Sequence, residues 1–256
     1  MYFERIGRLG YILSVLTLLF GESCTVKEDR RDCPCLLSVE FSSLPPGPVE
    51  YRMEAMDGSL LARETVTRDS VYFFKVPRDG VRLISMAGTA LSNDVVIPLG
   101  SDCPPAYISY ACYDTNHEAA QIQPAFNKHF CTLSITLDGP PGDGGPVQIG
   151  IRGGVGAISR EGRPLPGEFS YTTSGKASPL TCRLPRQGPS GQLLLDIVME
   201  DNLLRTFALG TYLRQSGYDW GEKDLKDISV TICLSVTHIT FHIQDWSVCV
   251  ERNVEI

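Results

Sequence analysis

Residues Val49–Ala55 of this 256-residue chain read VEYRMEA, so apolar and charged side chains alternate at every step. A period of two is typical of a β-strand that buries one face. Asp57-Gly58 follows, a pair that tolerates the positive φ angles of a tight turn, and the chain resumes at Ser59–Thr67. The stretch therefore predicts an antiparallel hairpin with its valine, tyrosine and methionine side chains in a core.

The same alternation extends through the chain on both sides of this hairpin. Upstream, Leu37, Val39 and Phe41 alternate with more polar positions. The further β-like runs are Val71–Val76, Val81–Ala87, Asp94–Leu99, Ala106–Ala111, Cys131–Leu137, Val147–Arg152, Leu193–Met199, Ile228–Leu234 and Ile239–Ile243. Many short strands separated by Gly and Pro turns indicate β-sandwiches.

Three local segments depart from strands. Leu209–Ser216 favours a short helix, which Gly217 would end in the left-handed conformation. Glu222–Lys226 is expected to add one further helical turn. Gly153–Gly156, GGVG, follows a strand without a phosphate-binding lysine, so we interpret it as a glycine-rich turn.

One segment predicts a domain boundary. Residues Gly139–Pro146 read GPPGDGGP, which cannot form a helix or a central strand. The fold expected is all-β, with two β-sandwich domains in series and one short helix in the second. We expect a signal peptide at 1–23, an N-terminal sandwich at 24–138, a linker at 139–146 and a C-terminal sandwich at 147–256.

The N-terminus has the pattern of an export signal. Two arginines precede Leu9–Phe20, an uncharged and mostly apolar run. A membrane-spanning helix needs about 20 apolar residues, whereas the apolar region of a signal peptide has about 7–15. A small residue before Cys24 indicates lipoprotein cleavage there, and acyl chains on Cys24 would hold the chain on a membrane. Ordinary signal-peptidase cleavage nearby is the alternative, because Glu22 is unusual at such a site.

The cysteine count fits an exported protein. Nine cysteines are present, and removing Cys24 leaves an even number, which indicates disulfides in an oxidising compartment. Cys131 and Cys233 lie in apolar β-runs and are interpreted as small buried residues. The candidate disulfide cysteines are Cys33, Cys35, Cys103, Cys112, Cys182 and Cys249, and the sequence alone assigns no pairing among them.

Signatures of catalysis and of nucleic-acid binding are absent from the sequence. It contains no phosphate-binding GxxxxGK[ST] and no GxSxG nucleophile motif. A net charge of −7 without a basic cluster argues against nucleic acid. His238 and His242 share one face of a strand, about 13 Å apart, which is too far to bind one metal ion. We therefore expect no enzyme activity, no cofactor and no metal.

Two stretches of the sequence resemble one known family. Cys24–Cys35 reads CTVKEDRRDCPC and leads into the first strand. The second stretch runs from Leu209-Gly210, through SGYDW at Ser216–Trp220 and LKDI at Leu225–Ile228, to the strand that ends at Trp246. Together they resemble the FimB-type family of fimbrial anchor lipoproteins from Bacteroides-type bacteria.

That resemblance implies a specific fold and role. It implies two transthyretin-like β-sandwiches and an outer-membrane lipoprotein, exposed at the surface, that holds a fimbria and limits its length. Cys24 matches the lipidated position, and Lys27, Glu28 and Asp29 resemble a surface-export signal. The implied partners are the outer membrane, through lipid on Cys24, and fimbrial shaft subunits, through addition of a β-strand to an open sheet.

Two alternatives follow from single segments. After Trp246, residues Val248, Val250 and Val254 alternate as in a strand, which favours closure of the chain's own last sheet over pairing with a neighbour. A surface lipoprotein that binds glycan or another nutrient would share the export signal and the sandwiches. Such a protein needs an aromatic platform, and the nearest candidate is Tyr107, Tyr110 and Tyr113, although a continuous strand would split them between two faces.

Overall fold

The computed structural model describes residues 33–138, 148–174, 179–188, 192–198, 204–234 and 238–251. Residues Cys35–Ile256 form one compact unit. The predicted signal peptide, Cys24, the export signal at 27–29 and the Gly/Pro segment at 139–146 lie outside the described residues.

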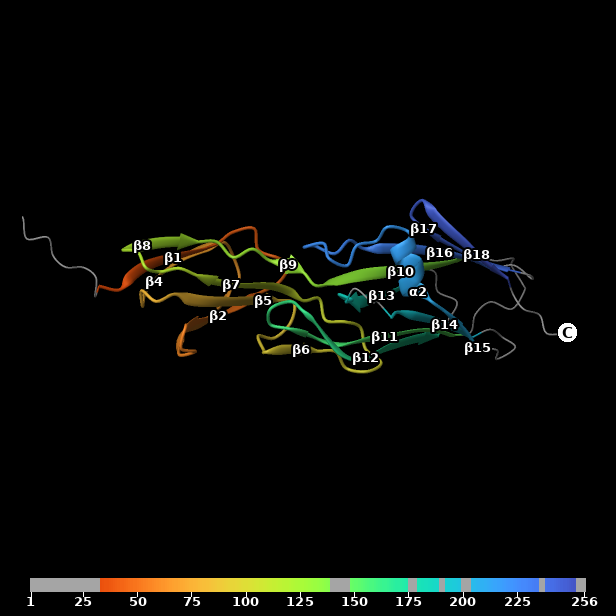
Figure 1. Cartoon of the computed structure of the whole chain (residues 1–256), viewed down its shortest axis with the longest axis horizontal. Coiled ribbons are helices and arrows are strands. Elements are labelled where there is room, and N and C mark those ends of the chain that lie inside the picture. Colours follow the sequence, from red (N-terminus) through yellow and green to blue (C-terminus); the bar gives the residue numbers. More distant parts are fainter. Residues whose placement is uncertain are drawn as a thin grey trace, which may run out of the picture. The chain divides into compact units, whose positions relative to one another are not determined.

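Two sheets make up the first sandwich (Figure 1). The smaller sheet has the order β4 (Ser70–Val76), β1 (Cys35–Phe41) and β8 (Ala119–Ile122). The larger has the order β3 (Leu60–Val66), β2 (Val49–Ala55), β5 (Val81–Ala87), β7 (Tyr107–Tyr113) and β9 (Asn127–Lys128). Alternate residues of β1 and β2, including Leu37, Phe41, Tyr51 and Met53, are buried between them. The hairpin predicted from Val49–Ala55 is confirmed, since β2 and β3 pair across the Asp57-Gly58 turn.

A second pair of sheets encloses the larger core. One sheet has the order β13 (Leu180–Pro185), β10 (Phe130–Asp138), β16 (Ile228–Leu234), β17 (His238–Ile243) and β18 (Trp246–Glu251). The other has the order β12 (Pro164–Ser174), β11 (Gln148–Ser159), β14 (Leu194–Val198) and β15 (Leu204–Phe207), and β6 (Asp94–Val96) also pairs with β11. The expected all-β fold of two transthyretin-like sandwiches is confirmed, with one short helix among the described residues.

β10 belongs to the second sandwich, whereas we expected it in the first. We expected residues up to 138 to complete the first sandwich, yet β10 lies beside β13 and β16. Leu133 and Ile135 of β10 pack in one core with Ile149 and Ile151 of β11. The strands on either side of the Gly/Pro segment, β10 and β11, thus belong to two facing sheets of the second sandwich. Alternation along β10 shows that one face is buried but does not identify the facing sheet.

The helix occurs where the sequence predicts it. α2 (Leu209–Gln215) buries Leu209 and Leu213, and Gly217 follows it with a φ of +84°. Among the described residues, no helix is long and apolar enough to cross a membrane. The extra turn predicted at Glu222–Lys226 is wrong: that segment is irregular, and its backbone groups bond to distant residues.

The glycine-rich turn predicted at Gly153–Gly156 is also wrong, because these residues lie within β11. The register between β11 and β12 shifts around Gly153 and Val155, as at a β-bulge. A Cβ on Gly156 would lie 2.9 Å from the Cα of Gly167 in β12. The glycines therefore permit a close approach of two backbones.

A buried guanidinium fixes the irregular segment after α2. Arg186, just beyond β13, is only 8% exposed. Its nitrogens donate five hydrogen bonds, from Nε to Nδ1 of His129 (3.1 Å), from Nη1 to the carbonyls of Trp220 (2.6 Å) and Glu222 (2.7 Å), and from Nη2 to those of Lys128 (3.0 Å) and Lys223 (2.8 Å). All five N–H donors of an arginine are thus used. One side chain joins the β9–β10 junction, the end of β13 and the loop that carries Trp220.

His129 is buried next to this arginine, although no partner for it is evident in the sequence. Because Nδ1 accepts a hydrogen bond from Arg186, the neutral imidazole carries its proton on Nε2. Burial, followed by the charge of Arg186, lowers the pKa of His129 to about 4. The imidazole also lies against Gly162, whose φ of +79° and lack of a Cβ leave room for the ring.

Replacement of Arg186 tests the importance of this contact. Arg186→Gln keeps at most two donors and leaves buried carbonyls unpaired, each at about 1–3 kcal/mol. We expect the free energy of unfolding, measured by urea denaturation, to fall by at least about 3 kcal/mol. The control is Arg163→Gln, which removes an arginine that is exposed and pairs with Glu161, and should cost less than about 1 kcal/mol. Equal losses in the two variants would contradict the assignment.

The depressed pKa of His129 makes stability depend on pH. An unfolded chain protonates His129 near pH 6.5, whereas the folded protein resists protonation until about pH 4. The stability from the neutral imidazole is therefore fully present above pH 6.5 and is lost as pH falls towards 4, by about 3 kcal/mol in total.

The control for this prediction is His129→Asn, which retains an acceptor for Arg186 but does not titrate. The free energy of unfolding of each protein is measured at several pH values between 4 and 7. We expect the two stability curves to converge as the pH falls. Only the unsubstituted protein loses stability through protonation of His129, because asparagine does not titrate. Curves that stay parallel would show that His129 contributes no pH dependence.

Candidate functional site

The candidate disulfide cysteines are spread over both sandwiches. Cys33 is exposed, and free thiols are present on Cys35, Cys103, Cys112, Cys182 and Cys249. Cys35 is buried in the first core, while Cys103 and Cys182 share the second core with Cys131, which is buried as predicted. Cys233, for which burial was also predicted, is only partly buried. Burial raises the pKa of the Cys103 and Cys131 thiols to about 12, so both stay protonated and unreactive. Disulfide bonding of the candidate cysteines stays a prediction.

The strand register excludes one disulfide partner, Cys233, for the exposed thiol of Cys249. Thr240 of β17 lies opposite both Cys233 of β16 and Cys249 of β18. The two cysteines are thus two strand spacings apart, about 10 Å, which is too far for a disulfide. His242 is exposed on the same strand as Thr240, as the alternation predicts.

No aromatic platform forms from the three tyrosines of β7. Tyr107–Tyr113 is one continuous strand, so Tyr110 points to the opposite face from the other two. Tyr107 packs edge-to-face on Phe130, with 5.4 Å between ring centroids. Tyr110 and Tyr113 pack against different cores. The tyrosines are therefore used for packing, which weakens the glycan-binding alternative at this position.

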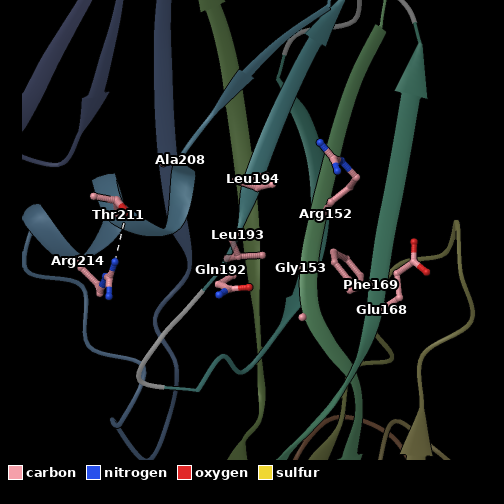
Figure 2. Close-up of a pocket in the computed structure, with 11 residues that line it drawn as sticks. Arg152, Gly153, Glu168, Phe169, Gln192, Leu193, Leu194, Ala208, Thr211 and Arg214 are labelled. Atoms are coloured by element: carbon pink, nitrogen blue, oxygen red, sulfur yellow. Dashed lines mark hydrogen bonds between the residues drawn. The ribbon is translucent and has the colours of Figure 1, made fainter.

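One cavity of about 480 Å³ opens on the second sandwich, between β11, β12, β14 and α2 (Figure 2). Volumes of about 300–1,000 Å³ are usual for small-molecule sites. The residues that line it are Arg152, Gly153, Gly154, Glu168, Phe169, Gln192, Leu193, Leu194, Ala208, Thr211 and Arg214. Figure 2 shows Arg152 on β11 and Arg214 on α2 on opposite sides of Leu193.

The groups around this cavity are mostly already paired. Arg152 donates to both carboxylate oxygens of Asp196, at 2.5 and 3.0 Å, and holds the pKa of that carboxyl below its usual range. Arg214 donates to the hydroxyl of Thr211 at 3.2 Å. The Phe169 ring is fully buried and offers no face on which a sugar could stack. The cavity therefore offers no aromatic face for a sugar, and its two arginines already have partners.

The outer edges of several sheets are protected against a further strand. β12 carries Pro164 and Pro166, which cannot donate to a ladder. The outer edge of β13 is covered, since the Arg183 N–H donates to Asp102 and the Cys103 N–H donates to the Arg183 carbonyl. β8, β9 and β15 have four residues or fewer. Each of these is a recognised way of preventing edge-to-edge association.

β18 is an edge strand without such protection, as are the seven-residue strands β3 and β4 of the first sandwich. It pairs with β17 along its whole length, which confirms the prediction that the tail closes the chain's own sheet. Within the described residues, no strand pairs with its other edge. Its sequence, WSVCVE, has no Pro or Gly, and Trp246 and Val248 are only half-buried against the core. An added strand could bond to this edge and complete the burial of these two side chains.

Comparison of the chain with known proteins identifies similar solved structures at low sequence identity. A candidate polysaccharide-binding protein from Bacteroides thetaiotaomicron is 11% identical, with a TM-score of 0.63 over 84% of this chain and 98% of that one. A candidate adhesin from Bacteroides ovatus is 11% identical, with a TM-score of 0.61 over 87% and 96%. The fimbrial anchor protein Mfa2 from Porphyromonas gingivalis is 11% identical, with a TM-score of 0.57 over 84% and 99%.

By sequence, no family model and no curated protein matches this chain. The structural similarity nonetheless extends over nearly the full length of each solved chain. At these identities the similarity concerns the fold. The chain therefore has the fold shared by candidate Bacteroides adhesins and the Porphyromonas gingivalis fimbrial anchor protein, as the resemblance in its sequence implied.

Proposed function

We propose that this chain is an outer-membrane lipoprotein that holds a fimbria at the cell surface and limits its length. The observation that carries the proposal is the shared fold with a fimbrial anchor protein over 99% of that protein. The Cys24–Cys35 and Ser216–Trp220 stretches, which resemble anchor lipoproteins, support it independently. We infer no enzyme activity and no cofactor.

In this proposal the N-terminal segment supplies the attachment to the membrane. Lipid on Cys24 inserts into the outer membrane, and about 0.8 kcal/mol per buried CH₂ makes two or three acyl chains a firm anchor. Lys27, Glu28 and Asp29 direct the chain to the cell surface. The charged residues that follow act as a tether to β1.

The edge of β18 supplies the attachment to the fimbria. A strand of a shaft subunit pairs with β18, and its main-chain hydrogen bonds provide affinity. Alternate side chains of the added strand cover Trp246 and Val248, which provides specificity. In this arrangement the subunit receives a strand at the edge of β18 and is attached to the membrane through its N-terminal lipid. The fimbria can therefore extend in one direction only.

Loss of the lipid anchor is the first test. In fimbriated cells that produce this chain, Cys24→Ala should move both the chain and its fimbriae into the medium, as measured by immunoblotting of cells and supernatant. The matched control, Cys112→Ala, changes another exposed cysteine and should leave fimbriae on the cells. Fimbriae that stay attached to the Cys24→Ala cells would contradict the anchor function.

The β18 contact is tested through its native thiol. Cys33→Ser with Cys112→Ser leaves Cys249 as the exposed thiol, and Cys33→Ser with Cys249→Ser leaves Cys112. A photoreactive maleimide on Cys249 should crosslink to a fimbrial subunit, whereas the same label on Cys112 should not, as read by mass spectrometry. Crosslinks from Cys112 alone would place the partner on the first sandwich. A chain that captures saccharides and no fimbrial subunit would favour the glycan-binding alternative.

A further inference from the structure

One end of the first sandwich is defined by four strand termini, and we name it the proximal end. β1 begins at Cys35, opposite Val76, where β4 ends. The turn Pro77–Gly80 then leads to Val81, the first residue of β5. Val81 pairs with Ala55, the last residue of β2. Both sheets therefore present an end at the point where the described chain begins.

Exposed apolar side chains gather near this proximal end. Phe73 is 69% exposed, Leu60 59%, Leu36 48% and Met56 44%. Met56 and Leu60 flank the turn of the β2–β3 hairpin, while Leu36 and Phe73 lie on the outer face of the β4–β1–β8 sheet. Single exposed apolar residues are ordinary on protein surfaces, but several at one end of a domain indicate an interaction site.

Two of these side chains border a shallow depression of about 300 Å³. It is lined by Leu36, Ser38, Phe73, Ala119, Ala120 and Gln121. Lys75 lies directly opposite Leu36 in the β1–β4 register and is exposed. An aromatic ring and aliphatic side chains beside a lysine are the composition of surfaces that contact the boundary between lipid headgroups and acyl chains.

We propose that the proximal end of the first sandwich docks on the outer-membrane surface, with Phe73, Leu36, Leu60 and Met56 inserted at the level of the lipid headgroups. This inference rests on the proposed lipid on Cys24. It adds a second contact, made by the folded domain itself, to the one made by the acyl chains.

The length of the tether supports lipid as the occupant. Only the segment from Cys24 to Cys35 separates the acyl chains from β1, and at about 3.3–3.6 Å per residue it spans at most about 40 Å. The proximal end therefore stays within about 40 Å of the site of acylation. Tethering at this range gives effective concentrations of about millimolar or more, so even a weak apolar contact with lipid is populated.

The test uses the full lipidated chain in vesicles of phosphatidylethanolamine and phosphatidylglycerol. Phe73→Trp places a reporter at the proximal end. Val96→Trp is the matched control, because Val96 is 67% exposed but lies on β6, which pairs with β11. Flotation of the vesicles reports the lipid anchor, and quenching of tryptophan emission by lipids brominated near the headgroup reports docking. Emission from Trp220 and Trp246 is the same background in both variants.

We expect both variants to float with the vesicles, and the added tryptophan of Phe73→Trp to lose most of its emission while that of Val96→Trp is unaffected. Flotation without quenching of Phe73→Trp would overturn the docking inference and leave the anchor function standing. Failure to float would overturn both. Quenching that disappears at low protein density in the vesicles, with crosslinks between chains, would show that a second copy covers this surface and would also overturn the inference.

Discussion

The irregular loop between α2 and β16 is held in place by one guanidinium. Backbone groups outside helices and ladders must find partners, because an unpaired buried carbonyl costs free energy. Arg186 supplies such partners for Trp220, Glu222 and Lys223, and it binds Lys128 and His129 at the same time. The loop can therefore lie against the sandwich without regular structure, and it carries Tyr218, Trp220 and Leu225 into the core.

Other polar contacts extend this arrangement to the adjoining strands. Asp227 accepts from the Lys128 ammonium and from the Thr132 backbone, both at 2.7 Å. The Tyr218 hydroxyl donates to the Lys226 carbonyl at 2.7 Å. These bonds fix the loop just before β16, where Ile228 pairs with Leu133 of β10. The polar network around Arg186 thus fixes the point at which the chain enters β16, and strand pairing positions β17 and β18 beyond it.

The parts of the fold that the sequence predicts are those with a local cause. Residues Val49–Ala55 alternate because one face of β2 meets the core and the other is less buried, and α2 ends at Gly217 because glycine adopts a positive φ at low cost. β12 was not predicted, since Pro164, Pro166 and Gly167 resemble turn residues although they stand in an edge strand.

The features that were not predicted depend on residues far apart in sequence. Nothing near Arg186 indicates that its acceptors are Lys128 and Glu222, because the contact exists only once β9, β13 and the loop after α2 have come together. The unprotected edge of β18 could be anticipated from its lack of Pro and Gly. Its position at the margin of a sheet could not, because strand order is set by tertiary packing.

The parallel pairing of β10 with β16 has a consequence for the order in which the molecule can form. Leu133 can pair with Ile228 only after Ile228 has been made, so the sheet that contains β10 stays incomplete until most of the chain is present. Contacts between such distant residues form slowly, because a long loop must close first. A chain threaded through a membrane N-terminus first would expose β10 well before β16, and its second sandwich could not close early. The topology itself thus delays the second sandwich, whereas the strands of the first sandwich, which all lie between Cys35 and Lys128, have their partners early.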